Sequence, residues 1–207
     1  MPISDRRPDP ARRRLLGGAL ALGAALALPR AVLAQATNQA RSLVETISAE
    51  VVALVNSGRG EAQMYAEFER VLARYADMPA VAAASLGPAW RTATPAQQRA
   101  FVAAFQSYLA RKYGRQFRDY RNASIQVTGA RDAGNAGVLV NTVVQRPGQA
   151  NIAIDWQISA RSGAPKAVNL IIEGISMLSN ERAEIGAMLE ASRGSIDGLI
   201  QRMQARS

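Results

Sequence analysis

Side chains that could carry out acid–base or nucleophilic chemistry are scarce in this 207-residue chain. It contains no His and no Cys, which removes the usual general base, the Ser–His and Cys–His nucleophile pairs and most zinc sites. Two carboxylates, Asp155 and Glu173, lie in predicted strands. A helical tyrosine, Tyr108 or Tyr113, could pair with them in an acid–base isomerase. Strand alternation places Asp155 opposite Trp156, so we expect it to face solvent. The sequence therefore predicts no enzyme, no metal and no organic cofactor.

A second group of candidate functional residues is basic. Five positive side chains fall within eleven residues that end at Arg121, and four of them are candidates for docking to a partner or a membrane: Arg111, Lys112, Arg115 and Arg118. We call these basic residues the basic ridge, and they could bind anionic lipid, an acidic partner surface or a lipid phosphate. Alternatively, they could form a solvated helix face. No aromatic residue is interleaved on the basic ridge, which argues against binding of single-stranded nucleic acid.

The helix that carries these residues has a clear beginning. Thr94 is a favourable N-cap and Pro95 suits the first helical position. Gln97 follows the cap by three residues and completes a capping box. Apolar residues then recur every four positions as one stripe: Phe101, Phe105, Leu109, Tyr113 and Phe117. The pattern predicts a helix of about 25 residues, or about 40 Å, with Gly114 as the place for a kink.

Helical and alternating periods divide the rest of the chain. Amphipathic or short helices are predicted at 37–55, about 61–76 and 80–86. Strands separated by turn residues are predicted at 123–131, 137–146, 151–160 and 166–173. Two further helices are predicted at about 180–192 and 195–206. The expected fold class is α+β: a curved antiparallel β-meander of about four strands, wrapped by helices, with the long aromatic helix covering its apolar face.

Residues 1–34 have the layout of a cleavable export signal. Three consecutive arginines end at Arg14 and precede an uncharged apolar run of 14 residues that ends at Leu28. Such a run is too short to span a bilayer comfortably. The pair Arg12-Arg13 resembles the motif of a twin-arginine signal. An ordinary Sec signal and an uncleaved membrane anchor are the alternatives. We expect residues 35–207 to form one domain that works in the periplasm.

Removal of the expected signal changes the charge of the protein. The whole chain carries 25 basic and 16 acidic residues, net +9; residues 1–34 hold six Arg and two Asp, which leaves 19 basic and 14 acidic, net +5. This mild excess is not typical of a nucleic-acid-binding protein. The absence of Cys suits an exported protein of the periplasm better than one that leaves the cell.

The helix stripe and the sheet would face each other across a shared interior. Small residues lie beside the aromatics, so this interior either packs solid as an ordinary core or encloses a cavity. The residues expected to line such a cavity are Phe101, Phe105, Tyr108, Tyr113, Val138, Val140, Thr142, Ile152, Ile154, Trp156 and Ile172. At roughly 0.8 kcal/mol per buried methylene, a chain of about 16 carbons would contribute about 10 kcal/mol gross, enough to make lipid extraction feasible.

Three blocks of the sequence match a known pattern in the right order. Residues 86–117, LGPAWRTATPAQQRAFVAAFQSYLARKYGRQF, are followed by EGISM at 173–177 and GSIDGLI at 194–200. They resemble the MlaC / toluene-tolerance family of periplasmic lipid carriers. The resemblance implies a cone-like roll similar to nuclear-transport-factor-2-like domains, which holds phospholipid acyl chains between helices and sheet. It also implies shuttling between inner and outer membranes, which maintains outer-membrane lipid asymmetry.

The resemblance further implies partners and leaves alternatives open. The implied partners are an inner-membrane ABC transporter complex, an outer-membrane lipoprotein–porin complex and, transiently, a membrane surface. One strand departs from the family pattern, because Asn169 occupies the position of an Asp and the family's Trp is absent. This departure favours another lipid, such as a hopanoid, as an alternative ligand. A structural adaptor of an envelope transport system, which binds no lipid, is the other alternative.

Overall fold

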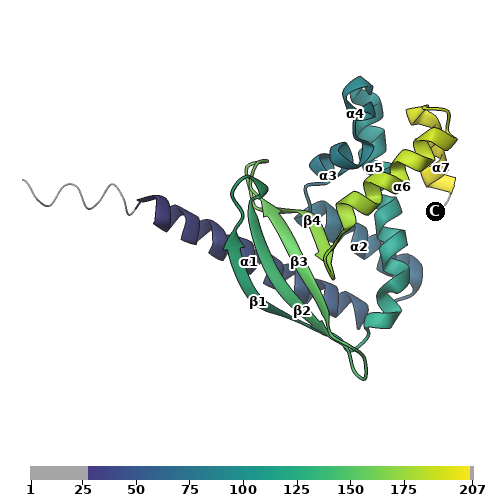
Figure 1. Cartoon of the computed structure of the whole chain (residues 1–207). Helices are drawn as coiled ribbons and strands as arrows, with labels where there is room; N and C mark the ends of the chain where they lie inside the picture. The colour runs from purple at the N-terminus through teal and green to yellow at the C-terminus, as the bar shows by residue number, and fades with distance from the viewer. Residues whose placement is uncertain (1–27, 206–207) are drawn as a thin grey trace, which may run out of the picture. The chain divides into compact units, whose positions relative to one another are not determined.

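The computed structural model describes residues 28–205, and the unit that begins at Thr37 contains a five-stranded antiparallel sheet (Figure 1). Its strands follow chain order: β1 (Ser124–Asp132), β2 (Val138–Gln145), β3 (Ile152–Ser159), β4 (Lys166–Ile172) and β5 (Ile175–Ser176). The expected meander is confirmed, and the two-residue β5 extends it by one strand. Most of the expected export signal, residues 1–27, lies outside the described residues.

Helices make up most of the remaining described chain. Five precede the sheet: α1 (Leu28–Val55), α2 (Glu61–Tyr75), α3 (Met78–Leu86), α4 (Ala89–Thr92) and α5 (Pro95–Gly114). The 3-10 turns η2 (Arg115–Tyr120) and η3 (Gly134–Ala136) lead into β1 and β2, and α6 (Met177–Ala191) and α7 (Ile196–Ala205) follow the sheet. The α+β class is thus confirmed. Within residues 28–205, no helix combines the length and hydropathy that crossing a bilayer requires.

The register of the strands decides which side chains share the inner face. Thr142 pairs with Ile154 and Val140 pairs with Trp156 between β2 and β3, and Ile154 pairs with Ile172 between β3 and β4. Because side chains alternate along a strand, these residues all lie on one face. Burial along β2 alternates accordingly between buried and partly exposed positions.

The turn into β2 requires a glycine. Gly137 has a φ of 88°, and a Cβ at this position would lie 2.1 Å from the carbonyl oxygen of Ile158. A side chain is therefore excluded both by the left-handed backbone and by the neighbouring strand. The hairpin between β1 and β2 can close tightly for this reason.

Helix α5 begins where the sequence predicts. The hydroxyl of Thr94 accepts a hydrogen bond from the Gln97 N–H at 3.2 Å, and the Gln97 side chain accepts one from the Thr94 N–H at 3.0 Å. The α-helix has 20 residues rather than about 25, because the chain tightens into the 3-10 turn η2 after Gly114. At Gly114 a Cβ would lie 2.6 Å from the ring of Tyr65, so glycine allows α2 to approach.

The sheet is covered by a different helix from the one expected. The part of α1 within the unit that begins at Thr37 packs directly on β2 and β3, through Ala40 and Val44 against Val138 and Val140. Phe101 and its neighbours on α5 instead pack into a separate helical core with α3, α6 and α7.

We predict that Thr94→Ala destabilises the protein by about 1 kcal/mol, because the Gln97 N–H at the start of α5 loses its capping partner. Urea unfolding should show a lower midpoint with an unchanged slope. Thr92→Ala is the matched control, since its hydroxyl only donates to the nearby Ala89 carbonyl at an exposed turn. The control should change stability by less than about 0.5 kcal/mol. An equal loss in both variants would contradict the assignment of the cap.

Candidate functional site

An apolar cavity of about 270 Å³ lies between the sheet and the helices in the unit that begins at Thr37. The sheet contributes a wall of aliphatic and aromatic side chains: Val144, Ile154, Trp156, Leu170 and Ile172. The helices and η2 contribute further apolar residues, among them Val51, Leu72, Val81, Leu109, Tyr113, Phe117, Tyr120 and Met177. Such a lining favours hydrocarbon over polar ligands.

Four of the residues expected to line a cavity lie together in this wall: Tyr113, Ile154, Trp156 and Ile172. Three of them come from β3 and β4, where the register brings alternate residues to the inner face. Tyr113 comes from the last turn of α5. The structure therefore brings these four residues together from the sheet and from α5.

The other seven expected residues lie outside this wall. Phe101, Phe105 and Tyr108 are buried in the helical core. Val138 and Val140 lie under α1, Thr142 is buried beneath the wall, and Ile152 is the first residue of β3. The aromatic stripe on α5 lies partly in the helical core and partly at the cavity, because Phe101 and Tyr113 are about 18 Å apart along the helix axis. Only the part of the stripe from Leu109 onward reaches the cavity.

Sequence reasoning missed the contributions of α2, α3 and η2. Leu72 of α2, Val81 of α3 and Tyr120 of η2 line the cavity. The apolar face of 61–76 was visible in the sequence, but periodicity alone assigns such a face to ordinary core. Phe117 was visible as the last member of the aromatic stripe. Which apolar face meets an empty space depends on how the helices diverge, and periodicity does not report that.

Trp156 is held in the wall by a buried hydrogen bond. Its Nε1–H donates to the Thr142 hydroxyl at 3.0 Å, and that hydroxyl donates to the Ile154 carbonyl oxygen at 3.0 Å. Thr142 is 2% exposed, so both of its hydrogen-bonding functions are satisfied inside the protein. These two hydrogen bonds fix the orientation of the indole. Because the indole N–H already has a partner, Trp156 needs no polar group from a ligand in the cavity.

A polar cluster joins α5 to α6 at the edge of the cavity, and we call it the α5–α6 bridge. Lys112 Nζ donates to Glu181 Oε1 and to Glu184 Oε2, each at 2.6 Å. The Tyr113 hydroxyl donates to Glu181 Oε1 at 2.5 Å, and the Tyr108 hydroxyl donates to Glu184. Glu181 is buried and belongs to the cavity wall, whereas Glu184 is partly exposed. The bridge thus runs from the surface to the cavity.

The protonation of the α5–α6 bridge follows from burial and pairing. Burial lowers the pKa of Lys112, but its hydrogen bonds to Glu181 and Glu184 outweigh burial and hold that pKa above its ordinary value. Burial, followed by a hydrogen bond to a carboxylate, raises the pKa of Tyr108 and of Tyr113. The lysine therefore stays charged and both tyrosines stay protonated across the physiological range.

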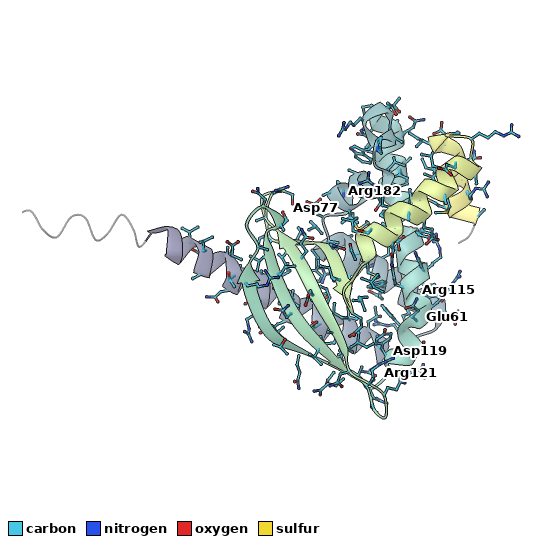
Figure 2. The ribbon with its side chains drawn as sticks, viewed as in Figure 1. Glu61, Asp77, Arg115, Asp119, Arg121 and Arg182 are labelled. Carbon is cyan, nitrogen blue, oxygen red and sulfur yellow. The ribbon has the colours of Figure 1, made fainter. Side chains whose placement is uncertain are left out.

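The expected basic ridge is not a uniform exposed surface. Lys112 belongs to the α5–α6 bridge, and burial lowers the pKa of Arg111, whose Nε is buried. Arg115 is exposed, as Figure 2 shows, while the side chain of Arg118 lies outside the described residues. Arg121 shares a small hollow with Glu61, so positive and negative groups are mixed at this end of the molecule.

The carboxylates considered for catalysis do not meet the tyrosines. Asp155 accepts a hydrogen bond from Asn141 at 2.7 Å, and these two residues pair on the outer face of the sheet. Glu173 accepts from the Ala153 N–H beside the turn into β5. Within residues 28–205, no group of three or more acidic side chains is arranged to hold a metal ion.

Comparisons with known proteins find a relative in sequence and a solved structure of similar fold. The intermembrane phospholipid transport system binding protein MlaC of Haemophilus influenzae is 27% identical over 124 residues, which cover 58% of this chain and 56% of that protein. The match thus spans little more than half the length of this relative. A solved structure of a phospholipid-binding protein from Ralstonia solanacearum, in complex with a phospholipid, is similar in fold. It has a TM-score of 0.70 and 22% identity over 81% of this chain and 96% of that one.

The family comparison covers most of the chain. The family model described as "MlaC protein" matches residues 45–205, which include all strands, the cavity wall and the α5–α6 bridge. This chain belongs to the MlaC family.

Proposed function

We propose that this protein is a carrier that shelters lipid acyl chains in the cavity and shuttles phospholipid between the inner and outer membranes. The single observation that supports this most directly is an apolar cavity of about 270 Å³ between sheet and helices in a chain of the MlaC family. The phospholipid named for the similar proteins fits such a lining. Binding and release would need no covalent chemistry.

The size of the cavity suits hydrocarbon of limited length. One water-sized group occupies roughly 10–15 Å³ of such a cavity. The cavity of about 270 Å³ therefore has room for about 20 water-sized groups. A methylene group is of similar size, so the cavity matches a single acyl chain better than two. Burial of about 16 methylenes contributes on the order of 10 kcal/mol gross. A second chain would need the helices to move apart.

The proposed location is the periplasm, reached through an export signal in residues 1–34. The proposed partners are an inner-membrane ABC transporter complex and an outer-membrane lipoprotein–porin complex. Exposed Arg115 is a candidate for contact with an acidic partner or an anionic membrane surface. Lys112 is not, because it is committed to the α5–α6 bridge.

Asn169, which stands where the family pattern has an Asp, has a structural role. Its side chain donates to the Ser176 hydroxyl at 3.1 Å and accepts from the Leu178 N–H at 3.0 Å, so it helps to cap α6. Asn169 also contributes to the cavity wall. A hopanoid or other non-phospholipid ligand therefore stays an outcome to be tested, together with an adaptor that binds no lipid.

The test is native mass spectrometry of the protein purified from the periplasm without detergent. We expect a discrete added mass that is released on denaturation and identified as phospholipid after extraction. A hopanoid mass would replace the phospholipid proposal with the alternative carrier. A protein that stays bare after incubation with phospholipid vesicles would contradict the carrier proposal and favour the adaptor.

We predict that Ile154→Trp blocks lipid loading, because the added bulk projects into the cavity from the middle of β3. Loading from vesicles, measured by native mass spectrometry, should fall by about tenfold or more, equal to about 1.4 kcal/mol or more. Ala153→Trp is the matched control: it is the next residue along the strand, is exposed and faces the opposite side. Normal loading of Ile154→Trp would exclude this cavity as the lipid site.

Val140→Trp is unsuitable as a loading probe. Val140 is 0% exposed and packs under α1, outside the cavity wall. A tryptophan there would overpack a solid core, and any loss of loading would follow from lost stability.

A further inference from the structure

One carboxylate oxygen of a residue that lines the cavity has no hydrogen-bond partner among the described residues. Glu181 is 3% exposed and is the only charged residue among those that line the cavity in the described part of the chain. Its Oε1 accepts from both Lys112 and Tyr113. Its Oε2 is equally buried and accepts from no group within residues 28–205. A buried carboxylate oxygen without a donor has lost its hydration and gained no bond in exchange.

The neighbours of Glu181 are already committed. Lys112 divides its contacts between Glu181 Oε1 and Glu184 Oε2, each at 2.6 Å. Tyr113 has one hydroxyl proton, which it donates to Oε1. The α5–α6 bridge therefore anchors one oxygen of Glu181 and leaves the other to a group from outside the cluster.

Three other polar groups of the cavity wall bond to the protein instead. The Tyr75 hydroxyl donates to Glu50 at 2.5 Å, the Asn169 amide donates to Ser176 at 3.1 Å, and the Trp156 indole donates to Thr142 at 3.0 Å. These groups do not supply the missing donor to Glu181. A group that enters the cavity with a ligand can supply it.

The free oxygen of Glu181 defines the kind of group that fits. A carboxylate oxygen can only accept a hydrogen bond, so its partner must carry a proton. A phosphate or carboxylate of a ligand would be repelled there. A neutral hydroxyl or a cationic ammonium would be attracted and would satisfy the free oxygen with a charge-assisted hydrogen bond.

We propose that Glu181 Oε2 accepts a hydrogen bond from a hydroxyl or ammonium group of the bound lipid. The cavity then selects lipids that carry such a donor over lipids of matched chain length that lack it. This selectivity rests on the proposed lipid-carrier function and adds a polar requirement to an otherwise apolar site. The donor has two sources, the head group or a hydroxylated acyl chain, and lipid pairs can separate them.

The test uses competition between matched lipids. Periplasmic protein stripped of its lipid is incubated with vesicles that contain equal amounts of two lipids, and the loaded species are counted by native mass spectrometry. Dioleoyl phosphatidylethanolamine against dioleoyl phosphatidylcholine tests a head-group ammonium. Phosphatidylcholine with a 12-hydroxystearoyl chain against its stearoyl counterpart tests a chain hydroxyl. We expect a preference of about tenfold or more for the donor-bearing lipid in one pair, and that pair identifies the source.

The variant Glu181→Gln tests the assignment to this residue. Its amide oxygen can still accept from Lys112 and Tyr113, while its NH₂ group replaces the free acceptor with a donor. The preference should therefore fall to about one or reverse. Glu184→Gln is the matched control, because it removes the same charge from the α5–α6 bridge but lies outside the cavity wall. It should keep the wild-type preference.

The outcomes separate this inference from the function on which it rests. Equal loading of both lipids in both pairs by the wild-type protein overturns the inference and leaves the carrier function standing. A preference that survives in Glu181→Gln overturns the role of this residue. No loading of any lipid by the wild-type protein overturns the carrier function and the inference together. The wild-type competition decides the question even if Glu181→Gln does not fold.

Discussion

The cavity depends on a polar connection between α5 and α6, whose shared apolar contacts lie away from the cavity in the helical core. Helix α5 packs on α2, α3 and α7, while α6 packs on α3, α7 and β4. At the cavity they are joined through Lys112 and Tyr113 of α5, which reach Glu181 of α6. Long side chains that bond end to end keep the two helices apart, and burial strengthens each bond. Interdigitated apolar side chains at the same place would fill the space instead.

The inner face of the sheet is divided between a solid core and an empty space. At Val138 and Val140 helix α1 lies directly on the strands, and the residues there are fully packed. Toward β4 the cavity separates the helices from the sheet, and Ile154, Leu170 and Ile172 line it. An apolar cavity forfeits dispersion contacts and does not attract water, so the empty protein bears a cost that an apolar ligand removes. A protein built in this way is stabilised by any ligand that fills the cavity.

In the described part of the chain, buried polar side-chain atoms around the cavity have hydrogen-bond partners within the protein, with one exception. The indole of Trp156 and the amide of Asn169 both bond to protein partners, which leaves their apolar surfaces to face the ligand. Glu181 differs, because its burial is supported by Lys112 on one oxygen only. The positive charge that the sequence placed on an outer ridge is thus partly used inside, to hold an acidic group at the cavity edge.

Local sequence by itself determined the elements and the family. The capping box at Thr94, the alternation in the four long strands and the turn glycines each depend on a few neighbouring residues, so short-range rules predict them. The three sequence blocks placed the chain in the MlaC family before any packing was known, and the family comparison agrees. The α+β class followed from the change of period after residue 121.

Tertiary structure decided which apolar faces pack and which face the cavity. Sequence periodicity marks a face as apolar but is silent about its partner, so Phe101 and Tyr113 looked equivalent on α5 although one closes a helical core and the other lines the cavity. The role of Lys112 was hidden for the same reason: its carboxylate partners lie 69 and 72 residues away along the chain. Contacts between distant segments depend on how helices cross and diverge, and the arrangement of the whole chain sets that geometry.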